Sequence, residues 1–430
     1  MATLKAVRGT RDLLPPETAL WNRIETTARA VFARYNFGEI RTPIFEETGL
    51  FARGVGEETD IVSKEMFTWE DRARALSEKP QSLTLRPENT AGVVRAYIEH
   101  KLGETGQLQK LYYIGPQFRR ERPQKGRYRQ FWQIGAEVIG PPSSGSESPL
   151  RDAEVLEMLA TLLDEMGITG WTLELNSVGS AADRARYNET LRAALEPVVG
   201  KMCVDCQRRA VTNPLRVLDC KVPEDQPIIA TLPVIADSLD EDSKKHFAAV
   251  KTALDASGVP YTLNPRLVRG LDYYTRTAFE FTHGGLGAQN AILGGGRYDG
   301  LSEALGGPKA PGIGFAMGLD RLVLTLQAQE AVQPSAPAKK LDAYIAPLGE
   351  SINAAALALA RELRRAGLSV ELGDGSFRLK KSFEAADRVA RKIVILGEDE
   401  LGSGILTVKD FATGTQTKVP RAELHDFLKN

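Results

Sequence analysis

The chain has 430 residues, and its 55 Lys and Arg residues against 56 Asp and Glu residues leave a formal net charge of −1. Hydrophobic residues make up 42% and charged residues 26%, which is typical of a soluble globular protein with two or three domains. These values exclude a disordered chain, a collagen, a disulfide scaffold and a protein that attracts its partner by overall positive charge. No apolar run approaches the ~18 residues of a membrane span, and the N-terminal segment lacks the apolar run of a signal peptide, so we expect a cytoplasmic protein.

A helix is predicted from residue 17 to about residue 35, where apolar residues recur at helical spacing after a pair of prolines. The next segment, residues 39–45, has an extended pattern but contains Pro43, which belongs on an edge strand or at a bulge. A boundary between subunits and a plain surface strand are both compatible with this pattern.

Two strand-like runs, residues 110–119 and 129–139, flank a basic loop and predict a long antiparallel hairpin. Residues 110–130 contain seven basic residues and one acidic residue, a local charge of +6. Such a local excess in a chain of net charge −1 predicts an anion site of nucleotide or RNA dimensions.

The region from residue 85 to residue 137 concentrates polar residues that alternate with apolar neighbours on predicted strands, so several should share one face. Because unpaired buried ions cost several kcal/mol each, this face is either a solvated surface or the lining of a polar substrate cavity. The interleaved Phe118, Phe131 and Trp132 favour the cavity. The polar residues are Arg86, Glu88, Thr90, Arg119, Glu121, Arg127, Gln133 and Glu137.

Residues 180–255 are predicted to be mostly helical and polar, and we interpret them as an insertion. Of the 39 glycines, 12 lie in residues 284–318, so the backbone there must turn tightly or approach another group closely. Residues 326–340 are rich in Ala, Pro and Gln and predict a linker. Residues 341–430 alternate strand and helix patterns, which predicts a small α/β domain.

Three cysteines, Cys203, Cys206 and Cys220, lie in the insertion. Their small, odd number argues against a disulfide framework and agrees with a reducing compartment. They offer three thiols but no obvious fourth ligand, so we favour a structural cysteine cluster over a zinc site and assign no metal ligand. A P-loop, a dinucleotide-binding fingerprint, an H-E-x-x-H motif and a nucleophile elbow are all missing from the sequence.

Further clusters of functional residue types follow the insertion. RGLDYYTRTAFEF places Arg269 close to Tyr273 and Tyr274, which are either packed rings with satisfied hydroxyls or a hydrogen-bonding wall for a small polar ring. GGGRYDG, residues 294–300, and GIGFAMGLDRLVL, residues 312–324, each combine glycines with an arginine.

These motifs resemble those of the class II aminoacyl-tRNA synthetases, and specifically the bacterial histidyl-tRNA synthetase family. Motif 1 resembles the first helix with RTPIFEETGLF, motif 2 resembles IGPQFRRERPQKGRYRQFWQIGAEVIG, and motif 3 resembles GIGFAMGLDRLVL. TLRPENTAG, RGLDYYTRTAFEF and GGGRYDGL make the resemblance specific to the histidine family. It implies an α+β catalytic core on an antiparallel sheet (residues 1–325), interrupted by the helical insertion at 180–255, then the linker at 326–340 and an α/β anticodon-binding domain (residues 341–430).

The resemblance implies a ligase that activates L-histidine with ATP, giving histidyl-adenylate and pyrophosphate, and then transfers histidine to the 3′ end of its tRNA. It also implies Mg²⁺ held through the ATP phosphates and a homodimer formed through motif 1, with no membrane partner. By resemblance, Arg119 and Arg269 are catalytic and hold the α-phosphate. The implied ATP-binding residues are Arg119, Glu121, Phe131 and Arg321. The implied histidine-binding residues are Glu88, Thr90, Arg119, Gln133, Glu137, Arg269, Tyr273, Tyr274 and Tyr298, and the implied contacts to the tRNA acceptor end are Gln124, Lys125 and Arg127.

Two positions depart from the family pattern. Asn89 stands where glycine is usual, and Trp132 where histidine or tyrosine is common. Asn89 tolerates unusual backbone angles, so we expect activity to persist.

The main alternative is the synthetase-like regulatory subunit of ATP phosphoribosyltransferase, whose members lack the anticodon domain and have degraded motifs. Another class II synthetase, such as a glycyl or prolyl enzyme, is disfavoured by the double tyrosine. Residues 341–430 contain 13 basic and 13 acidic residues, so we expect anticodon binding to rest on shape and base contacts more than on a basic field.

Overall fold

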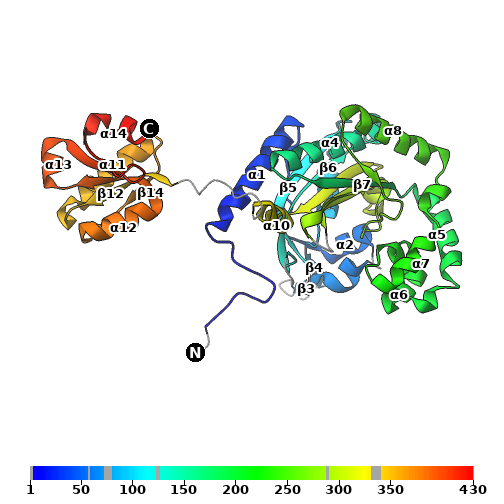
Figure 1. The fold of residues 1–430 in the computed structure, drawn as a ribbon. Coiled ribbons are helices and arrows are strands. Elements are labelled where there is room, and N and C mark those ends of the chain that lie inside the picture. The colour runs from blue at the N-terminus through cyan, green and yellow to red at the C-terminus, as the bar shows by residue number, and fades with distance from the viewer. Residues whose placement is uncertain are drawn as a thin grey trace. The chain divides into compact units, whose positions relative to one another are not determined.

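The computed structural model describes residues 3–56, 59–71, 80–122, 126–286, 290–330 and 340–429. The chain divides into two compact units, Met1–Gln333 and Pro334–Asn430, both drawn in Figure 1. No helix among the described residues is long and apolar enough to cross a membrane.

The first unit is built on an eight-stranded sheet. Its strands are β1 (Gly38–Glu39), β5 (Gln109–Phe118), β6 (Gln130–Ile139), β7 (Trp171–Ser177), β8 (Thr262–Leu263), β9 (Thr275–His283), β10 (Ala291–Arg297) and β11 (Gly312–Gly318). Their order is β1-β5-β6-β11-β10-β9-β7-β8. Every pair from β5 to β7 is antiparallel, and only the short edge strands β1 and β8 pair in parallel. The pairing of β5 with β6 confirms the predicted hairpin.

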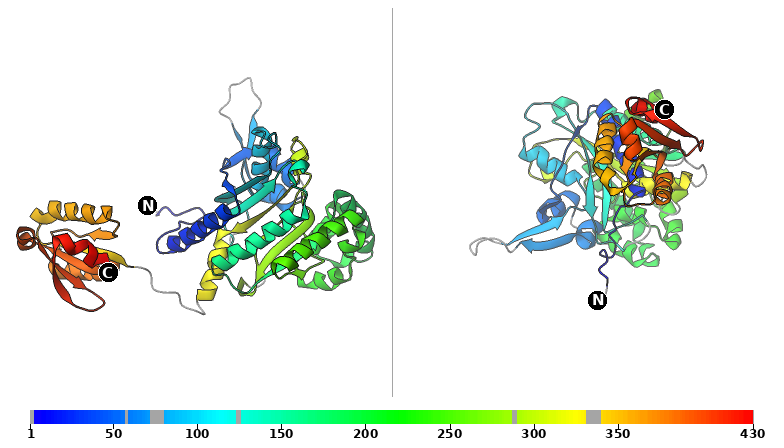
Figure 2. Two further views of the ribbon diagram at one scale, coloured as in Figure 1. Left: turned by 90° about the horizontal axis from the view of Figure 1, so that it is seen from above. Right: turned by 90° about the vertical axis from the view of Figure 1, so that its left-hand side faces the viewer.

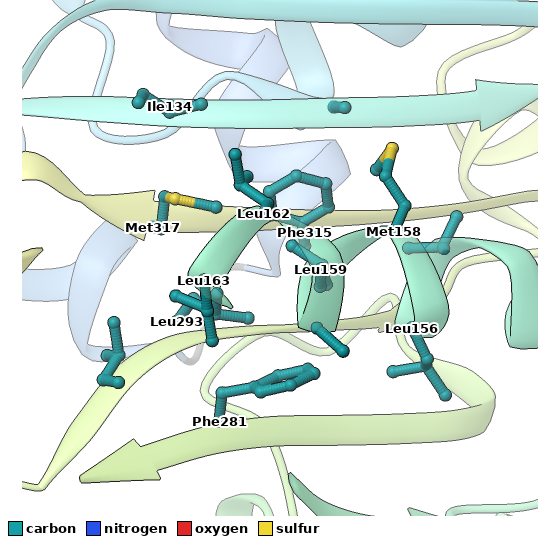
Figure 3. Packing of buried hydrophobic residues seen from close by; sticks show 14 of the residues in the cluster. Ile134, Leu156, Met158, Leu159, Leu162, Leu163, Phe281, Leu293, Phe315 and Met317 are labelled. Atoms are coloured by element: carbon teal, nitrogen blue, oxygen red, sulfur yellow. The ribbon is translucent and has the colours of Figure 1, made fainter. Parts of the chain in front are cut away.

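A layer of helices covers one face of this sheet (Figures 1 and 2). The layer contains α1 (Glu17–Arg34), α4 (Pro149–Glu165), α8 (Glu241–Ser257) and α10 (Leu319–Glu330). Alternate residues of β11, namely Ile313, Phe315 and Met317, are buried in the core that these helices share with the sheet. Figure 3 shows Leu159 and Leu162 of α4 packed against such side chains. Because side chains alternate along a strand, the residues between them face the other side, which is free to carry polar groups.

A second, three-stranded sheet has the order β2-β4-β3. Its strands are β2 (Phe45–Glu47), β3 (Phe67–Asp71) and β4 (Gln81–Leu85), and the helices α2 (Thr48–Val55), α3 (Thr90–Glu99) and α9 (Leu301–Ala304) belong to the same unit. The single extended segment predicted over residues 39–45 is wrong, since it is divided between β1 and β2 on two different sheets. Both strands are edge strands, and Pro43 lies between them, as expected for a residue that cannot donate to a ladder.

Residues 180–255 are mostly helical, as predicted. They form α5 (Ala181–Leu195), α6 (Val204–Thr212), α7 (Gln226–Thr231), α8 and short 3₁₀ helices that include η4 (Pro214–Asp219) and η5 (Pro223–Asp225). The segment from α5 to α7 has a core of its own, in which Tyr187, Leu191 and Ile229 are buried. Figure 1 shows α5, α6 and α7 grouped together beside the sheet, whereas α8 packs along α4.

Helix α10 extends to Glu330, so the first residues of the predicted linker at 326–340 are helical, and residues 331–339 lie outside the described part of the chain. The second unit contains a sheet of order β13-β12-β14-β15-β16. Its elements are β12 (Leu341–Pro347), α11 (Asn353–Arg365), β13 (Val370–Leu372), α12 (Leu379–Val389), β14 (Ala390–Leu396), α13 (Glu398–Ser403), β15 (Ile405–Asp410), β16 (Gln416–Pro420) and α14 (Leu424–Lys429). An antiparallel α+β core followed by an α/β unit confirms the predicted fold class.

Candidate active site

Glycines on β10 and β11 form the floor of the site, on the sheet face opposite the helices. At four of them, a Cβ atom would lie within 3 Å of a side chain that the sequence had singled out. These pairs are Gly294 with Arg269, Gly296 with Tyr274, Gly312 with Tyr298, and Gly314 with Glu137. The close approach predicted from the glycine-rich region is therefore confirmed, because side chains of predicted site residues, and at Gly296 and Gly314 also a backbone oxygen, occupy the space that Cβ atoms would need.

A cavity of about 710 Å³ opens over this face. That volume is within the range of small-molecule sites. Seven of the predicted site residues line it: Arg119, Glu121, Arg127, Phe131, Gln133, Arg269 and Arg321. The structure thus brings arginines from the hairpin, from the segment before β9 and from α10 around one space.

The arginines of the β5–β6 hairpin are held by specific contacts. Arg119 donates from Nε to the Pro87 carbonyl at 2.9 Å, and its guanidinium carbon lies 5.2 Å from the centre of the Phe131 ring. Glu121 lies between Arg119 and Arg127, at 3.9 and 3.0 Å from their Nη1 atoms. These contacts fix the direction of two cations at the mouth of the cavity.

Arg269 enters the cavity from the segment before β9. Its Nη1 donates to Oε1 of Glu280 at 2.5 Å, and its buried Nε has no hydrogen-bond partner within the described residues. Arg321 donates from Nη1 to the Ala291 carbonyl at 2.9 Å. Burial lowers the pKa of Arg321, and the nearby Arg127 lowers it further. An anion entering this cavity would relieve the mutual repulsion of its cations.

Two buried carboxyl groups, those of Glu88 and Glu137, also belong to the site. Glu88 accepts hydrogen bonds from the backbone N–H groups of Thr90 and Ala91, at 2.8 and 3.0 Å, at the start of α3. The Thr90 hydroxyl donates to Oε1 of Glu137 at 2.7 Å. Burial raises the pKa of Glu88, and it raises the pKa of Glu137 to about 8. The prediction that Glu88 and Thr90 lie on a strand is wrong, because Pro87 ends the extended segment and α3 begins at Thr90.

Three tyrosine rings surround the buried carboxyl groups. The rings of Tyr273 and Tyr274 are 4.7 Å apart, and those of Tyr273 and Tyr298 are 6.0 Å apart. Burial raises the pKa of all three hydroxyls. Oε1 of Gln133 is buried without a hydrogen-bond partner among the residues described, and the buried Tyr298 hydroxyl and Glu137 carboxyl interact with each other. Buried polar atoms are normally paired, so the Gln133 oxygen marks a place for a polar ligand.

Six of the predicted site residues do not line the 710 Å³ cavity, and they are here called the acidic pocket. They are Glu88, Thr90, Glu137, Tyr273, Tyr274 and Tyr298. Two connections join the acidic pocket to it. Arg119 contacts Pro87, the residue before Glu88, and Arg269 and Tyr274 both line a smaller cavity of about 320 Å³. Two of the predicted tRNA contacts, Gln124 and Lys125, lie outside the described residues.

Sequence reasoning missed Glu280, the partner of Arg269. The signal was present in TAFEF, where Phe279 and Phe281 face the helical layer and Glu280 must therefore face the site. Arg297, in contrast, is fully buried and pairs with Asp152 at 2.9 Å behind the floor, so it is a structural residue. Asn89 has an ordinary φ of −122°, so its position requires no glycine-like conformation.

Comparison with known proteins places these features in a family. The family model of histidyl-tRNA synthetase matches residues 9–322, and that of an anticodon binding domain matches residues 342–430. The chain is 73% identical to a histidine–tRNA ligase of Koribacter versatilis over 428 residues, covering 99% of this chain and 96% of that protein. It is 48% identical to a histidine–tRNA ligase of Bacillus velezensis, covering 98% of this chain and 97% of that protein. The structure matches apo histidyl-tRNA synthetase of S. aureus with a TM-score of 0.81 and 39% identity, covering 100% of both chains. The chain therefore belongs to the histidyl-tRNA synthetase family.

Proposed function

We propose that the chain joins L-histidine to its tRNA in two steps, adenylate formation with ATP followed by transfer to the tRNA 3′ end. Its family makes it an aminoacyl-tRNA synthetase and a ligase, with histidine–tRNA ligases as full-length relatives. The observation that carries the proposal is the arginine-lined cavity next to a buried acidic pocket on the same sheet face. An anionic nucleotide and a cationic amino acid require these two environments side by side.

In the first step, the histidine carboxylate attacks the α-phosphorus of ATP and pyrophosphate leaves in line. Arg119 and Arg269 hold the α-phosphate from two sides, and they also lie against the histidine carboxylate. Negative charge grows on the phosphate oxygens in the transition state, so cations fixed beforehand lower the barrier without a general base. The contacts of Arg119 with Pro87 and of Arg269 with Glu280 support this role, since both guanidinium groups are oriented in advance.

The adenine base is bound between Phe131 and Arg321, which both line the cavity. Phe131 stacks on one face and Arg321 supplies a cation–π contact on the other, while also reaching the γ-phosphate. Glu121 accepts a hydrogen bond from the adenine amino group. In this arrangement Arg119 gives up part of its present contact with the Phe131 ring when the base enters.

Mg²⁺ accompanies the β- and γ-phosphates and neutralises part of their charge when bound. All five acidic residues that line the cavity already have partners. Glu121, Asp219, Glu280 and Asp320 pair with Arg127, Lys221, Arg269 and Arg11, and Glu174 accepts a hydrogen bond from Asn264. The donor set therefore fits a metal ion held chiefly by phosphate oxygens and water, which is the usual mode for Mg²⁺ at nucleotides.

Histidine is selected by the acidic pocket. Glu88, Thr90 and Gln133 hold the α-ammonium group, and Glu137 with the three tyrosines surrounds the imidazole. Two buried carboxyl groups with raised pKa values favour a cationic ligand, because its charge stabilises their ionised forms. An apolar amino acid would leave the buried Gln133 oxygen unpaired and would offer no hydrogen bond to Glu137 or Tyr298, and such mismatches allow strong rejection.

The loop between β5 and β6 contacts the tRNA acceptor end through Gln124, Lys125 and Arg127, where an amide reads a base edge and cations hold phosphates. The second unit, which matches an anticodon binding domain, binds the anticodon end. Arg127→Ala should raise the KM for tRNA several-fold and flatten its salt dependence, with a smaller effect on adenylate formation. An unchanged salt dependence in aminoacylation assays would contradict this contact.

We also propose a cytoplasmic homodimer that forms through motif 1. Ile44 and Phe45 are about half exposed at the sheet edge, and the Phe45 ring lies 6.0 Å from that of Trp69. Such an apolar edge is typical of a surface covered by a partner. Sedimentation equilibrium of the full-length chain should give a dimer mass, whereas a monomer at micromolar concentration would contradict this part.

The decisive experiment is ATP–pyrophosphate exchange by the full-length chain with each amino acid in turn. Exchange should depend on histidine, and addition of histidine tRNA should release AMP as the amino acid is transferred. No exchange with histidine, or equal exchange with glycine or proline, would overturn the proposal. The same assay tests the regulatory-subunit alternative, which the anticodon-domain match and the presence of Arg119, Arg269 and Arg321 in one cavity already disfavour.

A further inference from the structure

The three cysteines of the helical segment converge with one aspartate. Cys203 precedes α6, Cys206 lies in its first turn, Cys220 follows η4, and Asp225 ends η5. Their sulfur and carboxylate oxygen atoms all lie within 4.8 Å of one another. Cys206, Cys220 and Asp225 are buried, with exposed fractions of 0%, 5% and 1%, and Cys203 is partly buried. Asp225 is the fourth group that the cysteine spacing alone did not reveal.

Two of the distances between these atoms are close to the edges of a tetrahedron around one ion. The Cys203 and Cys220 sulfurs are 3.9 Å apart. This is far longer than a disulfide bond of about 2.05 Å, but close to the edge of about 3.8 Å that follows from metal–sulfur distances of about 2.3 Å in a tetrahedral zinc site. The Cys220 sulfur is 3.2 Å from Oδ2 of Asp225, so only a small movement is needed to admit an ion between them.

The backbone around the cluster already orients the four groups. The N–H of Cys206 donates to the Cys203 sulfur at 3.4 Å, and the N–H of Val222 donates to the Cys220 sulfur at 3.4 Å. The N–H of Cys203 donates to both Asp225 oxygens, at 3.1 and 3.3 Å. Hydrogen bonds of this kind fix the ligands of metal sites and stabilise the charge on their donor atoms.

Asp225 gives a second, independent reason for a cation. It is almost fully buried, yet it forms no ion pair with a lysine, arginine or histidine of the described chain. A buried carboxylate is normally paired or bound to a metal, because an isolated ionised group is costly in the interior. The neighbours that it does contact, thiols, become ligands themselves when a metal displaces their protons.

We propose that Cys203, Cys206, Cys220 and Asp225 bind one Zn²⁺ ion in a closed structural site. Sulfur-rich tetrahedral sets select zinc over magnesium or calcium, and four protein ligands leave no open position for catalysis. On binding, the thiols release their protons to solvent and the metal keeps its oxidation state. This site is separate from the proposed ligase chemistry and does not depend on it.

The site would fix one wall of the large cavity. Leu218, Asp219, Cys220 and Lys221 line that cavity, so they couple the cluster to it directly. Arg209 on α6 and Arg216 on η4 both pair with Asp60, at 3.0 and 3.5 Å, which ties the same segment to the part of the chain before β3. The bound ion would therefore hold α6, η4 and η5 in register against the catalytic sheet.

The test is metal analysis of the full-length chain purified under reducing conditions without chelators. Inductively coupled plasma mass spectrometry should find about one zinc ion per chain. Asp225→Asn and Cys206→Ser should lose most of it, whereas Glu224→Gln, an exposed carboxyl next in sequence, should keep it. Retention of full zinc by both ligand variants would overturn the assignment.

A second measurement uses the wild-type chain and so does not depend on variants that fold. After removal of the metal, Co²⁺ should bind with one-to-one stoichiometry and give the visible d–d and sulfur-to-cobalt charge-transfer bands of tetrahedral thiolate coordination. Reloading with Zn²⁺ should abolish these bands and raise the Tm. Substoichiometric zinc with no cobalt bands and three freely titrating thiols would refute the site, and stoichiometric iron in the purified chain would refute the choice of zinc.

Discussion

The large cavity and the acidic pocket contain side chains of opposite charge, although they lie on one sheet face. In the cavity, several arginines face a shared space and only some are neutralised by Glu121 and Glu280. In the acidic pocket, Glu88 and Glu137 are buried with hydrogen-bond donors but without cations in contact, and burial raises their pKa values. The difference shows that the cavity is suited to an anionic ligand and the acidic pocket to a cationic one.

Removing the Arg269 guanidinium from the cavity should have the largest effect on activity. Since Arg269 is proposed to hold the α-phosphate, Arg269→Ala should lower kcat for ATP–pyrophosphate exchange by about 10³-fold through the loss of a preorganised positive charge. Binding of histidine alone, measured by calorimetry, should weaken much less. Lys221→Ala is the matched control, since Lys221 lines the same cavity with a side chain that is 83% exposed. Nearly intact turnover in a folded Arg269→Ala chain would remove the α-phosphate role.

Neutralising the acidic pocket should change stability in a pH-dependent way. The pKa of Glu137 is about 8 in the folded chain against 4.5 ordinarily, so the folded state binds more protons between these values. Stability from this group is fully present below pH 4.5 and is lost as pH rises through about 8. Glu137→Gln should therefore gain a few kcal/mol relative to the wild type between pH 5 and pH 9.

Urea unfolding of the ligand-free chain across this pH range measures that difference. Glu189→Gln, at an exposed carboxyl on α5, should run parallel to the wild type. If the curve for Glu137→Gln is also parallel, Glu137 is ionised in the folded chain and the contrast between the two regions is wrong.

Of the three changes that compare the cavity with the acidic pocket, the smallest effect is expected from adding one methyl group to the glycine floor. A Cβ at Gly294 would lie 2.4 Å from Nη2 of Arg269, the flexible end of that side chain. Gly294→Ala should displace the guanidinium and lower exchange by about 10- to 100-fold, with little change in Tm. Gly300→Ala is the control, because nothing lies within 4 Å of its Cβ and its φ is −102°. When Gly294→Ala is combined with Arg269→Ala, exchange activity should fall almost no further than in Arg269→Ala alone. Additive losses of activity would contradict the contact between position 294 and Arg269.

Local patterns predicted much of this architecture. Alternation of apolar and polar residues within single segments predicted the hairpin of β5 and β6. The same kind of local pattern predicted the α/β character of the second unit. The start of α3 was misassigned to a strand because polar and apolar residues alternate there, whereas the entry to the helix depends on the Glu88 carboxylate that caps it. Glu280 as the partner of Arg269 could not be predicted in the same way, because that pairing is set by tertiary structure. The same holds for the approach of Asp225 to the cysteines.

The glycine floor limits the order in which this site can change during evolution. At Gly294 and Gly312 the nearest atoms all belong to one side chain of a predicted site residue, whereas at Gly296 and Gly314 a backbone oxygen also lies within 3 Å of the Cβ position. A methyl group at Gly312 becomes tolerable only after Tyr298 has been shortened, because the three nearest atoms all belong to that side chain, and shortening Tyr298 first leaves a cavity that costs stability. Either first step is harmful alone, so substitutions at the floor must arrive in linked pairs. New specificity is therefore more accessible through single changes in the walls, at positions such as Gln133, than through the floor itself.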